Sequence, residues 1–555
     1  MSSRSDRVVI VGASAAGLRC ACRLRRLQPE RPITVVEANP VFSYAACGLP
    51  YVLSGDIDEL AALNRTVYGA DRDIEYFKKV KGIEVWSPWR AKAVDTGERT
   101  VHIENPSGEE RELTWGDLVL TTGASPRVLP SHIEHSRVHT FHTWEDVKPL
   151  KVGLMKGEIE HVAVVGAGLV GCELAEAFHS LWGAEVTLVE AAATPLPEIL
   201  DAELGAVVAA HLEKNGVKVV TGSPVSEISA DDEGVAANAG NEEIRADAVV
   251  VAVGVTPRVE LATAAGVELG DTGAIRIDER LATSVPHIWA AGDCVECRHA
   301  VTDGPAYLPL GSLANRQGRV LGNILADHED RLGPVTGAAA VKVFDFNVAT
   351  VGCTASRLKR TGMTVESAWV SAEDRAHYWP EAKLLLLAMV YDPETGRVLG
   401  VQGGSEEGEV AKRIDVASQL LARKAKTSDF AHIEHAYAPP FAPALDPLAV
   451  LGQVAENQTE GVEAVSPLTD LSATTVLDVR IPEEREERPL KAARLIDIEV
   501  GEVRDRETEL PEGSLVVACA HGTRSAEVAR WLGQRGRAVR YLGGGVSWRV
   551  RTRSK

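Results

Sequence analysis

The chain has no apolar segment long enough to cross a membrane. The longest apolar run after the N-terminal region, "LLLLAMV" from Leu384, is far shorter than the roughly 20 residues of a membrane-spanning helix. The first residues, "MSSRSD", lead into a short apolar strand that Gly12 interrupts, so we expect no signal peptide. These two absences predict a cytoplasmic protein without membrane attachment.

Positive charge and cysteine are both scarce. Against 79 Asp and Glu there are 59 Lys and Arg, and the net charge of -20 at pH 7 excludes a general nucleic-acid-binding surface. The cysteines stand at positions 20, 22, 47, 172, 294, 297, 353 and 519. Because this scatter lacks the spacing of a disulfide framework, we expect a reducing compartment, reactive thiols and no metal site.

The 555 residues suffice for several domains, and the first has the pattern of a dinucleotide-binding unit. "RVVIVGASAAGLRCACRLRRL" predicts a strand, a glycine turn and a helix, and the next strand, "ITVVEA", ends on Glu37. Gly12 suits a tight turn, Ser14 and Ala15 let the backbone approach a pyrophosphate, and Gly17 lets the helix pack closely. Glu37 would accept hydrogen bonds from ribose hydroxyls. A glycine turn without nucleotide is the alternative.

The same pattern returns in "HVAVVGAGLVGCELAEAFHSLWGAEVTLVEA", with Gly166, Gly168, Gly171 and then Glu190. Two such units predict two bound dinucleotides. Glu190 would repel a 2′-phosphate and no arginine follows it at once, which favours NADH over NADPH without excluding either. A structural duplicate that binds nothing is the alternative.

Two further apolar strands end at glycine-containing stretches, "LTTGASP" with Gly123 and "IWAAGD" with Asp293. Together with the two glycine loops they resemble the flavoprotein disulfide reductases, in which FAD and a nicotinamide cofactor meet over a redox cysteine. The resemblance spans about residues 7–450. It implies that Asp293 binds FAD and that a helix beginning after it points amides at the same phosphate. From the residue alone, Asp293 could equally cap a helix. The following "CVEC", Cys294 and Cys297, has the spacing of a redox pair, but it lies at an expected helix start and we do not favour a redox or metal role for it.

One cysteine, Cys47 in "FSYAACGLPYVLSG", has no second cysteine nearby. Such a thiol must cycle with an external partner, as a sulfenic acid with peroxide or as a mixed disulfide with a small thiol. Ala45, Ala46 and Gly48 leave room for that partner, and a following helix is expected to lower the thiol pKa. A buried structural cysteine is the alternative.

"CGLPYVLSG" resembles the coenzyme A-disulfide reductase and NADH-dependent persulfide reductase branch of this family. "AHYWPEAKLLL" and "HAYAPPFAPALDPLAVLG" are similar to that branch's dimerisation domain, which implies a homodimer in which Tyr378 and Tyr437 reach the partner subunit's cysteine. A departure is Ala46, where the family often has asparagine. Buried structural tyrosines are the alternative.

Coenzyme A is anionic, so its site on an acidic protein requires clustered cations. Arg19 and Arg23 share one face of the first helix by their spacing, and Lys81 is similar in placement to a lysine of the family's coenzyme A channel. Each of the three could instead be a solvated surface charge.

The last hundred residues follow a polar stretch, "AENQTEGVEAVSPLTD", that is typical of a linker. Cys519 ends an apolar strand and begins the loop "CAHGTRS", whose amides would converge on the sulfur, with Arg524 adding positive charge. This part resembles a rhodanese domain, and Asp478, Arg480 and "LGGGVSW" also match, although the family's His-Ile-Pro-Gly segment is absent. The resemblance implies that Cys519 carries sulfane sulfur. An inactive rhodanese fold is the alternative.

The predicted fold is α/β, with two Rossmann-like domains, an α+β dimerisation domain and a rhodanese-like domain. The expected ranges are 1–135 with 265–335 for FAD, 136–264 for NAD(P), 336–455 for dimerisation and 462–555 for the rhodanese-like domain. We predict an enzyme in which NADH or NADPH, through FAD and Cys47, reduces coenzyme A persulfide, polysulfide or coenzyme A disulfide. The alternatives are an NADH oxidase or peroxidase with a Cys47 sulfenic acid, and a non-enzymatic redox-sensing module.

Overall fold

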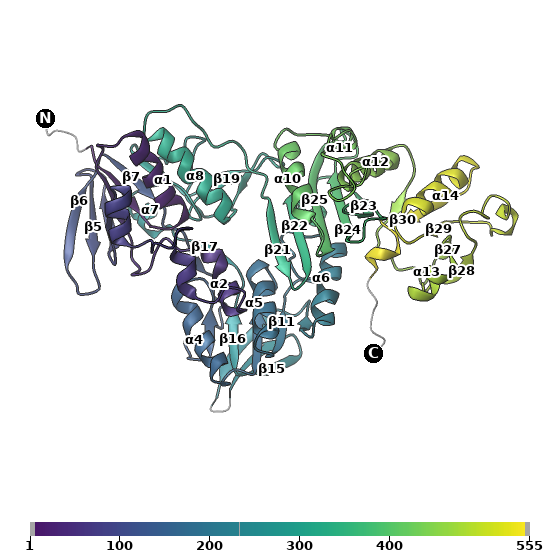
Figure 1. The fold of residues 1–555 in the computed structure, drawn as a ribbon, viewed down its shortest axis with the longest axis horizontal. Coiled ribbons are helices and arrows are strands. Elements are labelled where there is room, and N and C mark those ends of the chain that lie inside the picture. The colour runs from purple at the N-terminus through teal and green to yellow at the C-terminus, as the bar shows by residue number, and fades with distance from the viewer. Residues whose placement is uncertain (1–5, 232–233, 550–555) are drawn as a thin grey trace. The chain divides into compact units, whose positions relative to one another are not determined.

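The computed structural model describes residues 6–231 and 234–549 (Figure 1). The chain divides into two compact units. The first contains Met1–Gly166, Glu173–Thr187 and Val225–Val335, and the second contains Ala167–Cys172, Leu188–Pro224 and Thr336–Lys555. Within the described ranges, no helix combines the length and the apolarity that a bilayer crossing requires.

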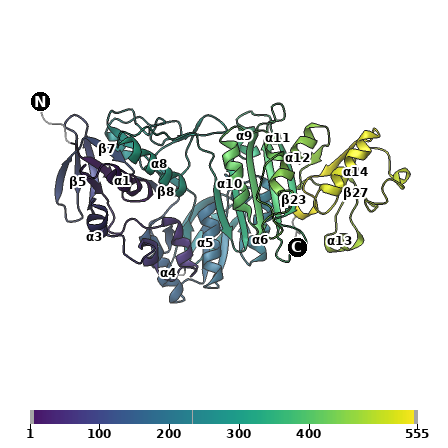
Figure 2. The ribbon, with the colours of Figure 1, turned by 45° about the horizontal axis from the view of Figure 1, so that its top comes forward.

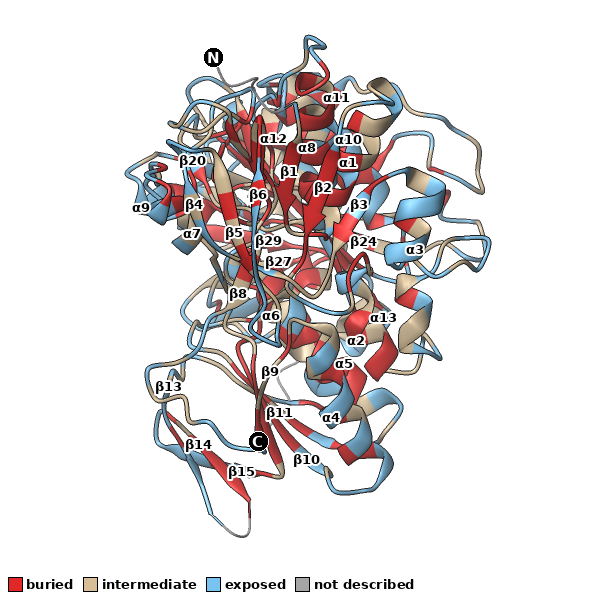
Figure 3. Cartoon of the chain, turned by 90° about the vertical axis from the view of Figure 1, so that its left-hand side faces the viewer, coloured by how far each residue is buried: buried red, intermediate tan, exposed pale blue. Residues whose placement is uncertain are grey.

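A five-stranded parallel sheet forms the core of the first unit, in the order β18-β7-β1-β2-β3. Its strands are β1 (Val8–Val11), β2 (Ile33–Val36), β3 (Glu84–Trp86), β7 (Asp117–Leu120) and β18 (Ile288–Ala290). The strands β1 and β2 are apolar and buried along their whole length, as the red ribbons of Figure 3 show. Continuous apolar runs are what a parallel sheet covered on both faces requires.

Helices α1 (Ala15–Leu27) and α8 (Gly311–Ile324) pack closely against each other in this unit. The contact depends on two glycines of α8. A Cβ atom on Gly318 would lie 2.3 Å from the carbonyl oxygen of Ala16, and one on Gly322 would lie 2.9 Å from that of Cys20. Glycine is therefore required where the two helix backbones meet.

The second dinucleotide-binding pattern also folds as strand, turn, helix and strand. Strand β10 (His161–Val165) pairs in parallel with β16 (Ala248–Val251), and β16 pairs with β9 (Val138–Thr140). Helix α5 (Leu169–Ser180) and strand β11 (Glu185–Val189) complete the pattern, and helix α6 (Ala202–Lys214) and strand β12 (Lys218–Val220) follow.

The first unit also contains antiparallel strands and further helices. Its antiparallel strands are β4 (Arg90–Asp95), β5 (Thr100–Glu104), β6 (Glu110–Thr114), β8 (Ala124–Pro126), β13 (Val225–Ala230), β14 (Val235–Ala239), β15 (Glu242–Ala246), β17 (Val255–Pro257), β19 (Cys297–Arg298) and β20 (Pro305–Ala306). Its other helices are α2 (Leu49–Leu53), α3 (Ile74–Tyr76), α4 (Trp144–Met155) and α7 (Glu260–Ala264).

An antiparallel sheet in the order β21-β22-β25-β24-β23 lies in the second unit. Its strands are β21 (Ala339–Val343), β22 (Phe346–Gly352), β23 (Glu366–Glu373), β24 (Leu384–Tyr391) and β25 (Val398–Glu406). Helices α10 (Val410–Leu421) and α12 (Pro447–Thr459) pack on this sheet (Figure 2). The shorter helices are α9 (Ala355–Arg360) and α11 (Thr427–Ala431).

A second parallel sheet completes this unit, in the order β26-β30-β29-β27-β28. Its strands are β26 (Ala464–Val465), β27 (Thr475–Asp478), β28 (Arg494–Asp497), β29 (Leu515–Ala518) and β30 (Val539–Leu542), and its helices are α13 (Pro482–Glu487) and α14 (Thr523–Gln534). We call the part from β26 onward the C-terminal domain.

The polar stretch at residues 455–470, expected to be a linker, is partly ordered secondary structure. Helix α12 extends to Thr459 because Ala455 is fully buried and Gln458 contacts the Tyr391 hydroxyl at 3.0 Å. Strand β26 then begins at Ala464. Tertiary packing thus overrides the local turn signals that predicted a linker.

Candidate functional site

The first glycine loop connects β1 to α1 as the sequence predicted. Gly12 has a φ of 109°, and a Cβ atom there would lie 2.1 Å from the carbonyl oxygen of Thr121. Gly17 packs equally tightly, since its Cβ would lie 2.1 Å from the carbonyl oxygen of Gly12. Ser14 precedes α1 and is exposed, and Ala15 is the first residue of the helix. This leaves the N-terminus of α1 open to an anionic group.

Glu37 follows β2 and is directed at this loop. Its Oε2 atom accepts a hydrogen bond from the Ala13 amide at 2.8 Å, and its Oε1 atom accepts two from the backbone and side chain of Asn39. Because each carboxylate oxygen has two lone pairs, Oε2 keeps one acceptor position for a ribose hydroxyl.

The second loop repeats this construction. Gly166 has a φ of 101°, and its Cβ would lie 2.5 Å from the carbonyl oxygen of Ala252. A Cβ on Gly168 would meet open space, and Gly171 is buried within α5. Glu190, just after β11, accepts hydrogen bonds from the amides of Ala167 and Ala192 at 2.8 and 2.9 Å.

Gly123 and Asp293 follow the strands β7 and β18 of the first sheet. Gly123 has a φ of 70°, and its carbonyl oxygen accepts a hydrogen bond from the Arg258 amide at 2.9 Å. Asp293 is half-buried, and burial raises its carboxyl pKa to about 6. A carboxylate placed in this way is ready for a ligand's hydrogen-bond donor.

The expected helix directly after Asp293 is absent, and that prediction was wrong. Cys297 instead begins β19, which pairs with β20, and the next long helix is α8, beginning at Gly311. Cys294 and Cys297 are buried and bind separate partners: the Cys294 thiol donates to the carbonyl oxygen of Ala291, and Cys297 accepts from the Gln317 side chain. Both thiols therefore lie in the core, and Cys297 lies in a strand in place of the expected helix.

These residues fit the two dinucleotides that the sequence predicts. The first loop offers the N-terminus of α1, the spare lone pair of Glu37 and the Asp293 carboxylate, which together suit the pyrophosphate and hydroxyl groups of FAD. The second loop offers the open space above Gly168 and the carboxylate of Glu190, which suit a nicotinamide dinucleotide.

Cys47 is exposed and lies in a 3₁₀ turn, Ala46–Gly48, directly before α2. The α8 N-terminus faces its sulfur: a Cβ atom on Gly311 would lie 3.7 Å from the Cys47 Sγ atom. All eight cysteines are free. The structural alternative of a buried thiol therefore does not apply to Cys47.

The pKa of the Cys47 thiol is raised, contrary to the expected lowering by the following helix. Desolvation by the surrounding protein is the largest cause, and the carboxylates of Glu173 and Asp293 add to it. Helix α2 has five residues only, so its dipole does not outweigh two nearby negative charges.

Sequence reasoning missed a hydrogen-bonded pair beside this cysteine. The Tyr51 hydroxyl, on α2, donates to the Glu173 Oε1 atom, on α5, at 3.2 Å. Burial raises the pKa of Glu173 to about 7, the bond from Tyr51 lowers it, and the charge of Glu176 raises it. The available signals were a tyrosine four residues after Cys47 and an acid in the apolar stretch "GCELAEAF".

Three predicted substrate-binding cations lie in one basic cluster of the first unit. Lys81 and Arg19 both act electrostatically on the half-buried Cys22 thiol, and Arg19 also acts on Arg23. We define the basic cluster as Arg19, Arg23, Arg26, Arg72, Lys81 and Arg319. The Nε atom of Arg23, on α1, donates to the side chain of Asn323, on α8, at 2.5 Å, and this bond fixes the Arg23 side chain. The cluster supplies local positive charge on a chain whose net charge is negative.

Tyr378 and Tyr437 are brought together and are exposed, at 64% and 51%. Limited desolvation, together with the charge and hydrogen bond of Tyr437, raises the pKa of Tyr378. Their exposure rules out the alternative of buried structural tyrosines. Two phenols held together on an open surface are available to another molecule.

One buried arginine anchors both tyrosine loops. The Arg413 side chain donates to the Asp374 carbonyl oxygen at 2.6 Å, four residues before Tyr378. It also pairs with the Asp446 carboxylate at 3.1 Å, just after the loop that carries Tyr437. The Asp374 and Asp446 contacts therefore fix the two loops relative to each other.

Cys519 is fully buried at the end of β29 and accepts hydrogen bonds in its own loop. The amides of Gly522 and Ser525 donate to its Sγ atom at 3.1 and 3.3 Å, and the Ser525 hydroxyl lies 3.3 Å from the same sulfur. Gly522 has a φ of 92°, which glycine alone adopts without cost. Ser525 is a contact that sequence reasoning did not identify.

Arg524 and a buried ion pair support this loop. Arg524 donates to the Glu484 carboxylate at 2.6 Å and interacts with Cys519. Arg480 and Asp478 form a fully buried pair at 2.7 Å, and Arg480 also donates to the Glu484 carbonyl oxygen at 2.9 Å. The pair thereby fixes the partner of Arg524.

The "LGGGVSW" turn closes the Cys519 loop on one side and contacts β23 on the other. A Cβ on Gly545 would lie 2.3 Å from the Ala520 carbonyl oxygen. The Ser371 hydroxyl of β23 donates to the Gly544 carbonyl oxygen at 2.7 Å, and the Trp548 indole donates to the Val370 carbonyl oxygen at 3.3 Å. The turn therefore connects the C-terminal domain to the antiparallel sheet.

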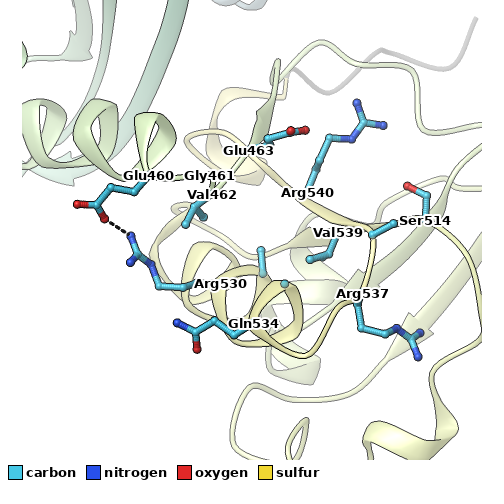
Figure 4. Close-up of a pocket in the computed structure, with 13 residues that line it drawn as sticks. Glu460, Gly461, Val462, Glu463, Ser514, Arg530, Gln534, Arg537, Val539 and Arg540 are labelled. Atoms are coloured by element: carbon cyan, nitrogen blue, oxygen red, sulfur yellow. Dashed lines mark hydrogen bonds and ion pairs between the residues drawn. The ribbon is translucent and has the colours of Figure 1, made fainter. Parts of the chain in front are cut away.

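A surface pocket of about 660 Å³ lies between the end of α12, helix α14 and β30 (Figure 4). Arg530, Arg537 and Arg540 line it with Glu460 and Glu463. Arg530 is neutralised by Glu460 at 3.1 Å. Neither Cys47 nor Cys519 belongs to this pocket, so it is not the candidate reaction site.

The described residues hold no cluster of three or more His, Cys, Asp or Glu arranged for a metal ion.

Comparisons with known proteins agree with this arrangement. Residues 6–316 match the model of the pyridine nucleotide-disulphide oxidoreductases, and residues 338–449 match that family's dimerisation domain. The NAD(P)H coenzyme A polysulfide/persulfide reductase of Pyrococcus horikoshii is 35% identical over 451 residues, 81% of this chain and 98% of that protein. The NADH oxidase of Methanocaldococcus jannaschii is 32% identical over 455 residues, 80% of this chain and 98% of that protein.

A solved structure covers both units. The NAD-dependent persulfide reductase from A. fulgidus superposes with a TM-score of 0.94 at 39% identity, over 98% of this chain and 100% of that one. The match therefore extends through the C-terminal domain. With two matching family models and relatives above 30% identity over most of the sequence, the chain belongs to the pyridine nucleotide-disulphide oxidoreductases, enzymes that bind FAD and NAD(P)H.

Proposed function

We propose that the protein uses NAD(P)H to reduce coenzyme A persulfide, polysulfide or coenzyme A disulfide through Cys47. The observation that carries this proposal is the environment of Cys47: an exposed thiol with no cysteine partner, facing the N-terminus of α8. A lone thiol completes a redox cycle only by bonding to an external sulfur or oxygen atom. The basic cluster of the same unit supplies cations for the phosphates of coenzyme A.

The proposed reaction is a thiol–disulfide exchange. The Cys47 thiolate attacks the inner sulfur of coenzyme A persulfide, so that a Cys47–coenzyme A disulfide forms and hydrosulfide leaves. When an electron pair enters this disulfide, its S–S bond breaks into the Cys47 thiolate and the coenzyme A thiolate, which takes up a proton. FAD, when bound, supplies that electron pair from the hydride of NAD(P)H.

The residues that hold the cofactors follow from the two loops. For FAD we propose Gly12, Ser14, Ala15, Gly17, Glu37, Gly123 and Asp293, and for the nicotinamide dinucleotide Gly166, Gly168, Gly171 and Glu190. The proposed ranges are 1–135 with 265–335 for FAD, 136–264 for NAD(P), 336–455 for dimerisation and 462–555 for the C-terminal domain. Glu190 favours NADH, because a 2′-phosphate would meet its negative charge.

We propose a homodimer in which Tyr378 and Tyr437 act on Cys47 of the partner subunit. The dimerisation-domain match and the exposure of both phenols support this arrangement. A phenol within reach of a leaving sulfur can donate a proton to it or stabilise a thiolate by a hydrogen bond.

For the C-terminal domain we propose a rhodanese role, with Cys519 carrying sulfane sulfur as a persulfide. Its support is the set of amides that donate to the Cys519 sulfur, with Arg524 beside them. Such donors stabilise an anionic sulfur. Because Cys519 is fully buried, a sulfur donor would reach it only when the loop moves.

Replacing Cys47 tests this function directly. In Cys47→Ser we expect NADH to bleach the flavin anaerobically as in the wild type, while coenzyme A persulfide and disulfide turnover falls by at least about a hundredfold. Stopped-flow absorbance measures the bleaching and the return of colour. Cys353→Ala, a buried thiol of the other unit, is the matched control. Sulfur turnover that survives in Cys47→Ser would disprove the Cys47 proposal.

An NADH oxidase or peroxidase is the second candidate. The relative named NADH oxidase favours it, and an exposed single thiol can also form a sulfenic acid with peroxide. The two candidates differ in the oxidant that restores the flavin colour. The non-enzymatic sensing hypothesis is set aside, because the family is one of oxidoreductases.

A further inference from the structure

The segment that closes the Cys519 loop is also a segment by which the C-terminal domain contacts strand β23. We call residues 543–548 the glycine turn. The glycine turn and β23 both belong to the second unit of the chain. Cys519 is fully buried, so a sulfur donor reaches it only after this region opens. What holds the glycine turn in place therefore bears on access to the thiol.

One side of the glycine turn is bonded to the backbone of the Cys519 loop. The Val546 amide donates to the carbonyl oxygen of Cys519 itself at 2.9 Å, and the Ser547 amide donates to the next carbonyl oxygen at 3.0 Å. A Cβ atom on Gly545 would lie 2.6 Å from the nitrogen of Gly522, whose amide donates to the Cys519 sulfur. The two backbones are thus in direct contact at the residue that holds the sulfur.

The other side of the glycine turn is held by β23 through two buried hydrogen bonds. The Ser371 hydroxyl donates to the Gly544 carbonyl oxygen at 2.7 Å. The Trp548 indole donates to the Val370 carbonyl oxygen at 3.3 Å. Ser371 is 3% exposed and Trp548 is fully buried. Because a buried polar group without a partner is unfavourable, both bonds stabilise the turn in this position.

We propose that β23 holds the Cys519 loop closed, and that release of the glycine turn from β23 is the step that opens Cys519 to a sulfur donor. Ser371 is a positioning residue, because it contacts the turn and not the sulfur. This inference rests on the proposed persulfide role of Cys519, and it deepens that role by assigning the movement that the role requires.

The backbone of the glycine turn suits this movement. Gly544 and Gly545 are consecutive glycines with φ of 64° and 75°. Glycine enters and leaves this left-handed region without the steric cost that other residues have. Gly545 lies directly between Gly544, which is bonded to β23, and Val546, which is bonded to the Cys519 loop. A change of conformation at these two glycines would move the turn and leave both sheets intact.

Sulfur transfer to Cys519 requires the open form. The Cys519 thiolate attacks the outer sulfur of a persulfide, R–S–S⁻, so that a new S–S bond forms at Cys519. The bond between the two sulfur atoms of the donor breaks, and R–S⁻ leaves. One sulfur atom moves and the charges balance, so the step needs no oxidant and no proton. A fully buried thiol offers no approach for this attack.

Alkylation of Cys519 measures the opening without a sulfur substrate. The holoenzyme and its variants are treated with iodoacetamide at one pH, and mass spectrometry follows the Cys519 and Cys47 peptides separately. Ser371→Ala removes the donor of the buried Gly544 carbonyl oxygen, which favours release of the turn. We expect Cys519 to be alkylated at least about tenfold faster than in the wild type, with an unchanged rate at the exposed Cys47.

Hydrogen exchange in the glycine turn distinguishes release of the turn from opening of the loop alone. The amides of Val546 and Ser547 exchange when the turn leaves the Cys519 loop, because they donate to that loop. We expect Ser371→Ala to speed their exchange by the same factor as the alkylation of Cys519. Faster alkylation with unchanged exchange would overturn the proposal, since the loop would then open by itself.

The matched control is Ser405→Ala, on β25 of the same sheet. Ser405 is 1% exposed and its hydroxyl donates to the Leu384 carbonyl oxygen at 2.7 Å, so the two variants lose equivalent bonds. We expect the wild-type rate at Cys519 in this control. A Ser371→Ala rate equal to the wild type would overturn the proposal, and so would equal acceleration in Ser405→Ala.

If Ser371→Ala does not fold, Trp548→Phe decides, because it lacks the indole donor to β23. Alkylation and exchange that match the wild type in this variant again overturn the proposal. A failure of the persulfide role is distinguishable from these results. It would appear as no added sulfur on the Cys519 peptide after treatment with polysulfide, whereas alkylation by iodoacetamide involves no sulfur transfer.

Discussion

At the scale of single residues, two glutamates perform the same task in the two dinucleotide-binding patterns. Glu37 accepts a hydrogen bond from the Ala13 amide, and Glu190 accepts one from the Ala167 amide, each at 2.8 Å. In both cases the amide belongs to the residue after the first glycine of the loop. The acid therefore fixes its own loop and keeps acceptor capacity for a ribose hydroxyl.

This role predicts how cofactor preference can be changed. Glu190→Ala combined with Ala191→Arg removes the charge that repels a 2′-phosphate and adds one that attracts it. We expect the ratio of kcat/KM for NADPH to that for NADH to rise at least about tenfold, corresponding to roughly 1.4 kcal/mol. Steady-state kinetics with both cofactors measures it. A ratio that stays unchanged would remove Glu190 from the cofactor site.

The pair of Tyr51 and Glu173 shows what single residues do not reveal in a sequence. Cys47 was identifiable because the cysteine and its small neighbours are adjacent in the sequence. Glu173 is 122 residues from Tyr51, so only the folded chain brings the acid to the tyrosine hydroxyl. Its raised pKa arises from burial, a property that residue spacing does not encode.

At the scale of elements, strand, turn and helix units were predictable where their signals are local. The order β1, α1, β2 follows from an apolar run, glycines and a terminal acid within one short stretch. The segment after Asp293 was mispredicted as a helix start, because β19 is specified by its partner β20 and not by its own residues. The expected linker failed similarly, since the last turn of α12 depends on contacts such as that of Gln458 with Tyr391.

The packing of α1 on α8 gives a prediction for an element. Gly318→Ala would place a methyl group 2.3 Å from the Ala16 carbonyl oxygen and 2.9 Å from the Arg19 Cβ atom. We expect the helices to separate, with a loss of about 1–3 kcal/mol in the free energy of unfolding. The release of flavin fluorescence on heating measures this loss.

Gly333→Ala is the matched control, because nothing lies within 4 Å of its added methyl group. If Gly318→Ala melts at the same temperature as Gly333→Ala and the wild type, the close helix contact does not exist in solution.

At the scale of the whole molecule, the proposed role of Tyr378 and Tyr437 requires two subunits. Cys47 and the tyrosine pair lie on different units of the chain, and both are exposed. If Tyr378 and Tyr437 act on the partner subunit's Cys47, then each reaction site is assembled from two chains. Oligomeric assembly would then be a condition of activity and not only of stability.

A mixed dimer tests this arrangement. One subunit carries Cys47→Ser and the other carries Tyr378→Phe with Tyr437→Phe, and two affinity tags isolate the heterodimer. If the tyrosines act across the interface, one site is intact, and we expect about half of the wild-type rate with coenzyme A persulfide. Each homodimer should be strongly impaired. A heterodimer no faster than the two homodimers would show that each tyrosine pair acts within its own chain.

The central claim is that a sulfur compound, through Cys47, is the oxidant of this enzyme. Its most direct test is anaerobic NADH consumption by one preparation supplied separately with coenzyme A persulfide, coenzyme A disulfide and hydrogen peroxide. We predict rapid consumption with the sulfur substrates and little with peroxide. Rapid consumption with peroxide alone would contradict the account, establish the peroxidase alternative and remove the coenzyme A role from Arg19, Arg23 and Lys81.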